Sequence, residues 1–155
     1  MTIGSDSNWT VLAAEDDKDA RLFLEHAFQE VGIKCSLRFV SDGDEAIDYL
    51  DGKPPYADRF THPLPEIVLL DVKMPRRDGF EVLKWIRGNE RIKRLIVIML
   101  TSSDEIKDIE LAYTLGANSY LNKCSNLQEF VELVKSLDTY WLKNNRAPDF
   151  SHLSP

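Results

Sequence analysis

Two uninterrupted apolar runs constrain the fold of this chain more than any other feature of its sequence. They are residues 67–70 and 95–100, and a pattern of helical spacing follows each, over residues 80–87 and 104–115. Such short runs cannot cross a membrane, because a transmembrane helix needs about 20 apolar residues. Continuous rather than alternating apolarity is typical of strands buried on both faces. The runs therefore predict a parallel sheet that is covered by helices.

The rest of the chain repeats this order of strand and helix. Shorter strand-like segments lie at residues 11–14, 35–40 and 119–121. The segments that follow them carry apolar residues at helical spacing: Phe23, Ala27 and Val31; Ala46, Ile47 and Leu50; and Leu127, Val134, Leu137 and Trp141. The alternation predicts an α/β fold, a (βα)₅ doubly wound parallel sheet with right-handed crossovers.

Several polar residues mark the ends of the expected helices. Asp42 with Glu45, and Ser125 with Gln128, have the spacing of capping boxes and predict two helix starts. Gly32 is placed to end the first helix, because glycine readily adopts the left-handed conformation found there.

A proline-rich stretch separates the second expected helix from the third expected strand. Residues 51–65 contain four prolines, and no regular element is expected to survive that many. We expect one domain over residues 9–145, with tails at residues 1–8 and 146–155 and no output domain.

Charge and cysteine content narrow the classes of function. The formal net charge of −7 disfavours non-specific binding to nucleic acid or to anionic membranes, so neither is expected as a partner. Cys35 and Cys124 lie far apart and outside any metal-ligand spacing. Two free thiols indicate a reduced, cytoplasmic protein.

Polar groups gather where the expected strands end. The residues at these carboxyl ends are Glu15, Asp16, Asp17, Asp71, Thr101 and Lys123. Ligands of open parallel sheets bind at this edge. Clustered carboxylates repel unless they are protonated or hold a hard cation, and Mg²⁺ takes oxygen ligands and leaves room for phosphate. A carboxylate can also act as a nucleophile toward phosphorus. Asp17 alone is better read as a helix cap than as a ligand.

Four segments of the chain resemble the response-regulator receiver domain of two-component signalling. They are Ala14–Asp17, Leu70–Pro75 with Asp78 and Gly79, Leu100–Ser102, and Tyr120–Lys123. The resemblance runs from about Val11 to Leu142, and it implies a flavodoxin-like receiver fold with strand order 2-1-3-4-5.

The resemblance also implies roles for the residues of the acidic site. Asp71 is then the residue that becomes the 4-aspartylphosphate. Asp16 would bind Mg²⁺ directly, and Glu15 would assist it through a water. The backbone carbonyl of Lys73 would be the remaining protein ligand.

Three further residues receive roles from the same resemblance. Thr101 and Lys123 would contact the phosphoryl group. Tyr120 corresponds to an aromatic residue that turns inward when the hydroxyl of Thr101 moves toward the phosphate. Thr101 and Tyr120 would thus form the switch of a phosphoprotein that is not an enzyme beyond its own phosphorylation and dephosphorylation.

Within the family, the chain looks most like stand-alone regulators that are paired with bacterial phytochrome-type histidine kinases. The supporting features are the proline-rich insertion, Lys73–Gly79 and Thr139–Leu142. The implied partners are a histidine kinase and a downstream protein target. A homodimer through the last helix is also expected, with Tyr140 and Trp141 as anchors.

Two positions near the site depart from the pattern or vary within it. Receiver domains usually have a cis proline after the site lysine, whereas Cys124 follows Lys123 here. A cis bond without proline costs about 2.5–4 kcal/mol, so either strain is stored in this loop or the bond is trans. Lys73 carries a long side chain that could shield the acyl phosphate, and we predict slow autodephosphorylation.

Two other classes of protein compete with a phosphorylation switch. An aspartate-nucleophile phosphatase of the haloacid-dehalogenase type needs an acid two residues after its nucleophile, and that position is Lys73. A flavodoxin-like electron carrier needs a hydroxyl- and glycine-rich phosphate loop after the first strand, where Glu15–Asp17 would instead repel phosphate.

Overall fold

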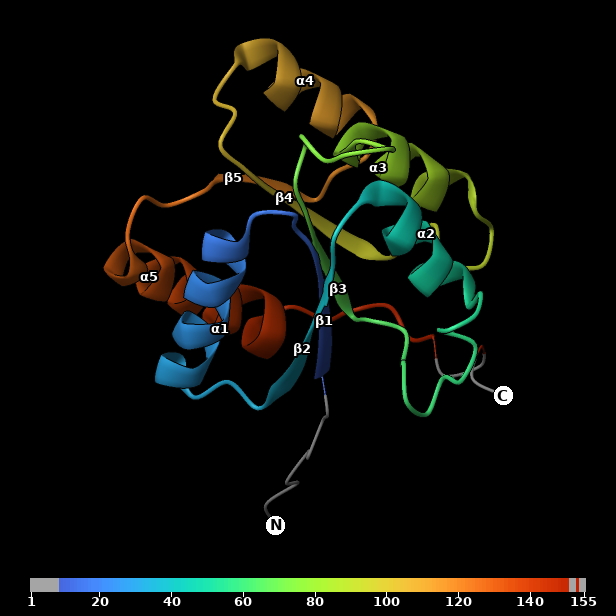
Figure 1. The fold of residues 1–155 in the computed structure, drawn as a ribbon, viewed down its shortest axis with the longest axis horizontal. Coiled ribbons are helices and arrows are strands. Elements are labelled where there is room, and N and C mark those ends of the chain that lie inside the picture. Colours follow the sequence, from blue (N-terminus) through green and yellow to red (C-terminus); the bar gives the residue numbers. More distant parts are fainter. Residues whose placement is uncertain (1–8, 151–152, 154–155) are drawn as a thin grey trace.

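The protein folds around a five-stranded parallel sheet with the order β2-β1-β3-β4-β5 (Figure 1). The computed structural model describes residues 9–150 and residue 153. The strands are β1 (Trp9–Ala14), β2 (Cys35–Val40), β3 (Ile67–Leu70), β4 (Ile96–Thr101) and β5 (Ser119–Asn122). The predicted (βα)₅ architecture and its strand order are therefore confirmed.

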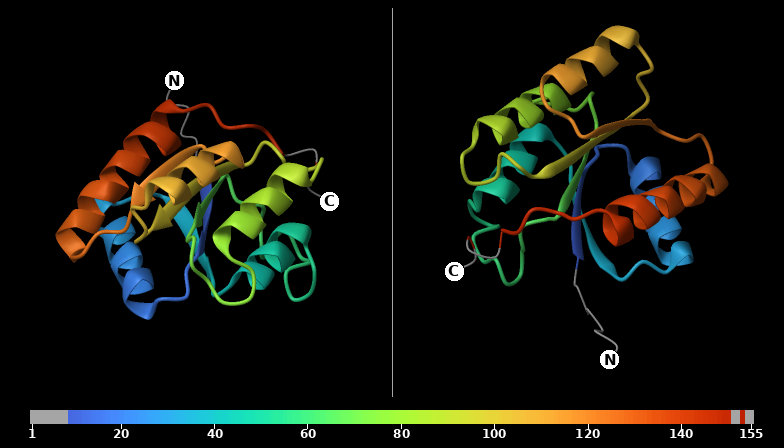
Figure 2. Two further views of the ribbon diagram at one scale, coloured as in Figure 1. Left: turned by 90° about the horizontal axis from the view of Figure 1, so that it is seen from above. Right: turned by 180° about the vertical axis from the view of Figure 1, so that it is seen from behind.

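Helices cover both faces of this sheet. They are α1 (Lys18–Val31), α2 (Gly43–Asp51), α3 (Gly79–Gly88), α4 (Ile106–Thr114) and α5 (Leu127–Leu137), and the π-helical turn η1 (Asp138–Asn144) continues α5. Helices α1 and α5 lie on one face, and α2 and α3 lie on the other, with α4 beside α3 (Figures 1 and 2). Within the described ranges, no helix is long and apolar enough to span a membrane.

The continuous apolar runs are buried on both faces, as predicted. Along β3, Ile67 and Leu69 pack into the cluster under α1 and α5. Val68 and Leu70 pack into the opposite cluster, which includes residues of α2 and α3. Successive side chains of a strand point to opposite faces, so a strand between two helical layers needs an apolar residue at each position.

The register of the parallel strands brings their carboxyl ends to one edge. Ala14 of β1 pairs with Leu70 of β3, and Leu70 in turn pairs with Met99 of β4. Thr101 of β4 pairs with Asn122 of β5. The residues that end or follow these strands therefore share one edge.

Two of the three expected helix ends are confirmed in full or in part. Gly32 ends α1 in the left-handed conformation, with φ of 77°. The side chain of Asp42 accepts a hydrogen bond from the Glu45 backbone N–H, at 2.8 Å. The reciprocal bond is displaced by one residue, because the Glu45 carboxylate accepts from the Ser41 N–H, at 2.7 Å.

The predicted capping box of Ser125 and Gln128 is wrong by one residue. Asn126 is the N-cap of α5, and its side-chain oxygen accepts from the Glu129 N–H at 2.9 Å. The Glu129 carboxylate accepts from the Ser125 N–H at 3.1 Å. Asn and Ser are equally good N-cap residues, and here the pair that begins one residue later satisfies the helix end.

The insertion before β3 has no helix or strand over residues 52–66, as expected, and its backbone is held by side chains. The Arg59 guanidinium donates to the carbonyl oxygens of Tyr49 and Leu50, both at 2.8 Å, and of His62 at 3.2 Å. The Tyr49 hydroxyl donates to the carbonyl oxygen of Pro63 at 2.9 Å. This long loop is thus pinned to the end of α2.

The chain after η1 returns across the amino-terminal edge of the sheet (Figure 1 and right panel of Figure 2). Ala147 packs against the cluster under α1 and α5, and Phe150 and Leu153 pack against the opposite cluster. Part of the segment expected as a tail from residue 146 thus joins the packed structure. Residues 1–8, 151–152 and 154–155 lie outside the described residues.

Candidate functional site

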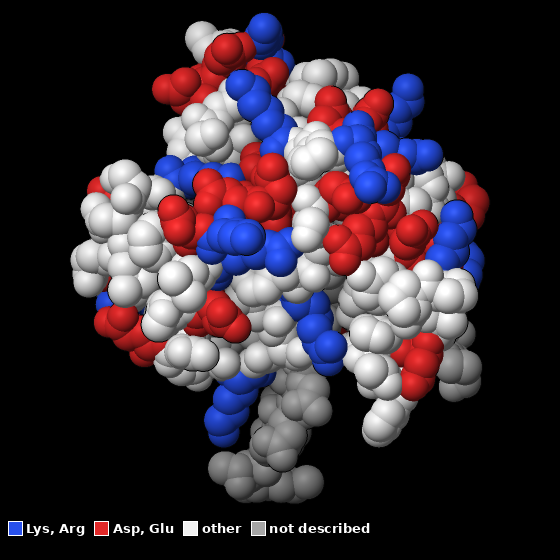
Figure 3. All heavy atoms as spheres, viewed as in Figure 1, with Lys and Arg blue, Asp and Glu red and all other residues white. Residues whose placement is uncertain are grey.

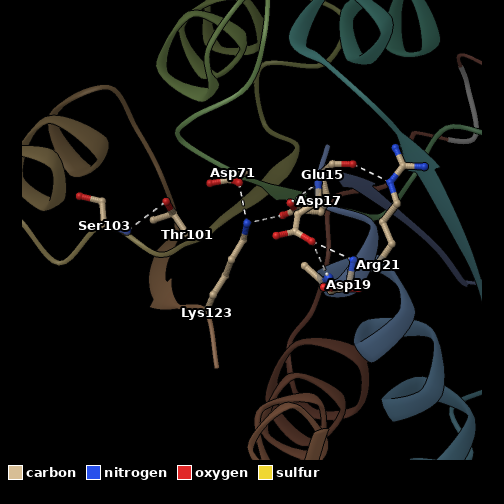
Figure 4. Close-up of polar contacts among 9 residues, drawn as sticks. Glu15, Asp17, Asp19, Arg21, Asp71, Thr101, Ser103 and Lys123 are labelled. Carbon is tan, nitrogen blue, oxygen red and sulfur yellow. Dashed lines mark hydrogen bonds and ion pairs between the residues drawn. The ribbon is translucent and has the colours of Figure 1, made fainter. Parts of the chain in front are cut away.

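The residues singled out at the strand ends meet at the carboxyl edge of the sheet. Glu15 and Asp16 directly follow β1, and Asp71 follows β3. Thr101 is the last residue of β4, and Lys123 follows β5. Figure 4 shows Glu15, Asp71 and Lys123 pointing toward one another, with Thr101 on the adjacent strand.

Lys123 bridges two carboxylates. Its Nζ lies 2.7 Å from Asp71 Oδ2 and 2.7 Å from Glu15 Oε2. Only 15% of the Lys123 side chain is exposed, and the two carboxylate side chains are nearly fully buried. Burial by itself lowers the pKa of Lys123, but the hydrogen bonds to Asp71 and Glu15 outweigh it and raise that pKa above its usual value.

Burial raises the pKa of the Glu15 carboxyl. The hydrogen bonds from Lys123 and from the Asp17 N–H lower that pKa but do not fully offset the loss of hydration, and nearby Asp71 adds to the rise. Glu15 is thus a carboxylate whose charge is costly unless positive charge lies beside it. Two carboxylates beside one ammonium group can accept further positive charge.

The acidic cluster fits a hard cation. Carboxylate oxygens of Glu15, Asp16 and Asp71 all lie within 4.8 Å of one another. Among the described residues, Asp71 Oδ1 is buried and has no hydrogen-bond partner, while Asp16 is exposed. A buried carboxylate oxygen without a partner is unfavourable, and a divalent cation with oxygen ligands would satisfy it. The donor set, all oxygen, suits such an ion.

Basic side chains lie among the acids at this edge. Figure 3, viewed from the same side as Figure 1, shows Asp and Glu side chains gathered at the top of the sheet, with Lys and Arg side chains among them. Lys73 lies in the loop after β3 and is exposed. A phosphate approaching this edge would therefore meet basic groups as well as acids.

The loop between β3 and α3 is closed tightly against Asp71. The Gly79 N–H donates to the Val72 carbonyl oxygen at 2.8 Å. A Cβ at Gly79 would lie 2.0 Å from the carbonyl oxygen of Asp71, so only glycine fits there. The signal in the sequence was the Asp78-Gly79 pair, but spacing alone could not show this close approach.

Ser103 connects the two residues expected to form the switch. Its backbone N–H donates to Thr101 Oγ1 at 3.3 Å, and its carbonyl oxygen accepts from the Tyr120 hydroxyl at 2.8 Å. Thr101 is buried, whereas Tyr120 is half-buried. Burial raises the pKa of Tyr120, opposed by its bond to Ser103. Nothing in the sequence singled out Ser103, because its contribution is made by backbone atoms.

Arg21 is a second residue that the sequence did not reveal. Its Nε donates to the Glu15 carbonyl oxygen at 2.6 Å, and its Nη2 donates to Ser41 Oγ at 2.8 Å. It thus ties the loop after β1 to the loop after β2. Asp17 is the N-cap of α1, with its side chain accepting from the Asp19 and Ala20 N–H groups, which confirms its interpretation as a cap.

The peptide bond between Lys123 and Cys124 is trans. Over the described ranges, the one cis peptide bond joins Pro54 and Pro55. Lys123 still reaches Asp71, so the hypothesis of strain stored in a cis bond at Cys124 is removed. Both cysteines are free thiols, as expected.

A match to a known family identifies the class of protein to which this fold and site belong. The profile of the response regulator receiver domain matches residues 11–135, so the chain belongs to that family. This confirms the resemblance seen in the four segments at the strand ends. Each of those segments lies at the edge where the candidate site is built.

Two similar response regulators align with nearly the whole chain. The crystal structure of response regulator RPA3017, in red light signalling of R. palustris, shares 42% identity at a TM-score of 0.86 and covers 91% of this chain and 99% of that one. Response regulator Rcp1 of Synechocystis is 31% identical over 89% of this chain and 92% of its own length. The Mn²⁺-bound form of Rcp1 has a TM-score of 0.82, at 30% identity and coverage of 91% and 99%.

A third relative has been solved in a modified state. The structure of the phosphorylated cyanobacterial phytochrome response regulator RcpA shares 30% identity at a TM-score of 0.85 and covers 92% of this chain and 99% of its own. The chain is therefore similar to phytochrome response regulators over nearly its whole described length.

Proposed function

We propose that this protein is a response regulator that accepts a phosphoryl group on Asp71 from a histidine kinase and signals through protein contacts. One observation carries the proposal: Asp71 has one oxygen held by Lys123 at 2.7 Å and one buried oxygen without a partner among the described residues. A purely structural carboxylate would be expected to have both oxygens satisfied. The acidic neighbours Glu15 and Asp16 suit the cation that phosphoryl transfer requires.

The reaction follows from the positions of these side chains. A carboxylate oxygen of Asp71 forms a bond to phosphorus while the bond from phosphorus to the imidazole nitrogen of the kinase breaks. The electron pair of the broken bond stays on that nitrogen. Lys123 is close enough to balance charge on the phosphoryl oxygens, and the hydroxyl of Thr101 is a donor for one of them.

We propose Mg²⁺ as the cation, held by Asp16, Asp71 and the backbone carbonyl of Lys73, with Glu15 acting through a water. A bound Mg²⁺ supplies positive charge to the phosphoryl oxygens and aligns them with Asp71. The Mn²⁺-bound form of Rcp1 supports a divalent cation in this family. Both ions accept oxygen ligands.

We further propose that Thr101 and Tyr120 transmit the phosphorylation state. A phosphoryl group that draws the Thr101 hydroxyl toward it would take away the acceptor of the Ser103 N–H. The Ser103 carbonyl oxygen also accepts a hydrogen bond from the Tyr120 hydroxyl. A shift of Ser103 would therefore release the Tyr120 ring to turn inward. Helix α4, which follows, exposes Ile106 and Tyr113, with 73% and 51% of each residue accessible. This face would present a different surface in each state.

The proposed partners are a phytochrome-type histidine kinase and a downstream protein. The relatives RPA3017 and RcpA, named for red light and phytochrome signalling, support the kinase class. A kinase charged from ATP works in the cytoplasm, and we expect the regulator there. We also propose a homodimer anchored by Tyr140, which is exposed and stacks edge-on against Trp141 with ring centroids 4.9 Å apart.

The proposed function is tested by phosphoryl transfer from a histidine kinase. A phytochrome-type kinase that has been autophosphorylated with labelled ATP is mixed with the protein, and label is followed on gels. We expect label to move to the parent protein with Mg²⁺, and neither to Asp71→Asn nor to the parent in a chelator. Label that reaches Asp71→Asn as fast as the parent would contradict the assignment of Asp71.

A further inference from the structure

The loop between β3 and α3 is held by ion pairs and close contacts with the start of α2. Arg77 Nε lies 2.9 Å from Asp44 Oδ1, and Arg76 Nε lies 3.6 Å from Asp42 Oδ2. Arg76 has φ of 66°, a left-handed conformation that residues other than glycine rarely adopt. We call Asp42, Gly43, Asp44, Arg76 and Arg77 the α2 clamp.

Gly43 makes the closest contact of the clamp. A Cβ at this position would lie 2.1 Å from the Arg77 carbonyl oxygen and 2.6 Å from the Arg77 Cβ. The obstructing atoms belong to the backbone and its first side-chain carbon, which cannot rotate away. Gly43 has no left-handed φ, so space and not conformation requires glycine here. The first residue of α2 therefore lies directly against the backbone of the loop.

The same helix end is joined to the loop after β1. The Glu45 carboxylate accepts from the Ser41 N–H at 2.7 Å. Arg21 links Ser41 Oγ to the Glu15 carbonyl oxygen, at 2.8 and 2.6 Å. The start of α2 thus contacts the loop after β3 directly, and it is linked to the loop after β1 through Ser41 and Arg21.

We propose that the α2 clamp fixes the loop that carries the Lys73 carbonyl, so that its members are positioning residues of the cation site. This inference rests on the proposed function. Mg²⁺ demands near-ideal octahedral geometry, whereas Ca²⁺ accepts a flexible ligand set. Groups behind the ligands commonly determine whether that geometry is reached. A loop that is displaced would therefore lose Mg²⁺ more than Ca²⁺.

The exposure of the two arginines offers a competing explanation. The side chains of Arg76 and Arg77 are 69% and 51% exposed, and exposed ion pairs contribute little to stability. Such a basic pair could instead bind an acidic surface of a partner protein. In that case the close approach at Gly43 would have no effect on the cation, which separates the two explanations.

The decisive variant is Gly43→Ala, with Gly88→Ala as its matched control. A Cβ at Gly88 would meet nothing within 4 Å, and both glycines lie in helices. Titration calorimetry with Mg²⁺ and with Ca²⁺ measures the affinity of the unphosphorylated protein, and denaturation confirms that each variant is folded. We expect Mg²⁺ to bind Gly43→Ala roughly tenfold more weakly, with a smaller loss for Ca²⁺, and Gly88→Ala to bind as the parent does.

A charge exchange gives a second, independent test. Asp44→Arg and Arg77→Asp should each weaken Mg²⁺ binding, and the double variant should recover most of the loss, because the pair at 2.9 Å is restored with its charges reversed.

The outcomes separate the clamp from the function on which it rests. If the parent binds Mg²⁺ and Gly43→Ala binds it equally well, the clamp is overturned and the cation site stands. If losses for Mg²⁺ and Ca²⁺ are equal, the clamp is a general structural contact and the positioning role is overturned. If the parent itself binds no divalent cation, the proposed function fails with it.

Discussion

Lys123 holds two buried carboxylates at once, and this is the residue-scale fact on which the site depends. The sequence predicted Lys123 and Asp71 at one edge because each follows a strand, and parallel strands end together. It did not predict that Lys123 also pairs with Glu15 at 2.7 Å. That contact depends on side-chain rotamers and on the depth of burial, which periodicity does not encode.

Glu15 should make stability depend on pH in a way that Glu15→Gln removes. Burial raises the pKa of Glu15 in the folded state, so the folded state holds this proton more tightly than the unfolded state does. The contribution of Glu15 to stability therefore rises as the pH falls through that raised pKa. In chelator, we expect the stability of Glu15→Gln relative to the parent to be greatest above the raised pKa of Glu15 and to shrink as the pH falls through it.

Denaturant titrations across this pH range provide the measurement. Because acids distant from Glu15 have the same surroundings in both proteins, their titration cancels in the difference. A difference that grows as the pH falls would contradict the raised pKa.

Lys73 should protect the phosphorylated form. Its exposed side chain stands two residues after Asp71, where it can cover the acyl phosphate from attacking water. We expect Lys73→Ala to lose its phosphoryl group a few-fold faster than the parent, and Lys73→Arg to stay close to the parent. Decay of the phosphorylated protein, followed by mass spectrometry after removal of the donor, measures this. Equal lifetimes for Lys73→Ala and the parent would refute the shielding role.

At the scale of elements, the helices were predictable but their attachments were not. Alternation and helical spacing located all five helices, whereas the start of α5 fell at Asn126 and not Ser125. Two neighbouring residues with equal capping preference cannot be separated without knowing which backbone N–H groups are free. The sequence also did not single out Arg87, because a basic residue on a helix is usually an exposed surface charge.

Arg87 should be worth far more to stability than its place on α3 suggests. Its guanidinium donates to the carbonyl oxygens of Leu95 at 2.6 Å, Lys93 at 2.9 Å and Gly116 at 2.9 Å, and to Asn118 Oδ1 at 2.9 Å. It thereby joins α3 to the turns on both sides of β4 and α4. We expect Arg87→Met to lower the free energy of unfolding by about 2–3 kcal/mol, because several polar groups lose a charged partner.

Lys84→Met is the matched control for that variant. Lys84 is an exposed residue of the same helix, and we expect its replacement to change stability by no more than about 0.5 kcal/mol. Equal effects of the two substitutions would mean that the Arg87 contacts contribute nothing beyond surface charge.

At the scale of the whole molecule, the carboxy-terminal segment closes the end of the sheet opposite the site. A tail was expected over residues 146–155. The contacts of Phe150 and Leu153 with the core are long-range, so only the tertiary structure reveals them. Single apolar residues in a polar segment carry no periodic signal.

Two phenylalanines offer a direct comparison of this packing. Phe150 packs against the core, whereas Phe60, in the insertion, is 97% exposed. We expect Phe150→Ala to lower the free energy of unfolding by about 1–2 kcal/mol. Phe60→Ala removes the same atoms from water-exposed surface and should change it by less than about 0.5 kcal/mol. Chemical denaturation measures both, and a Phe150→Ala variant as stable as the parent would show that the segment does not brace the fold.

The central claim is that Asp71 is a metal-dependent acceptor of a phosphoryl group, and intact mass tests it most directly. The protein is incubated with Mg²⁺ and either a small acyl-phosphate donor or an autophosphorylated histidine kinase, and its mass is recorded. We predict a gain of about 80 Da, the mass of one HPO₃ group, that is absent in Asp71→Asn and in the parent with chelator. An unchanged mass with both donors, or the same gain in Asp71→Asn, would contradict the account.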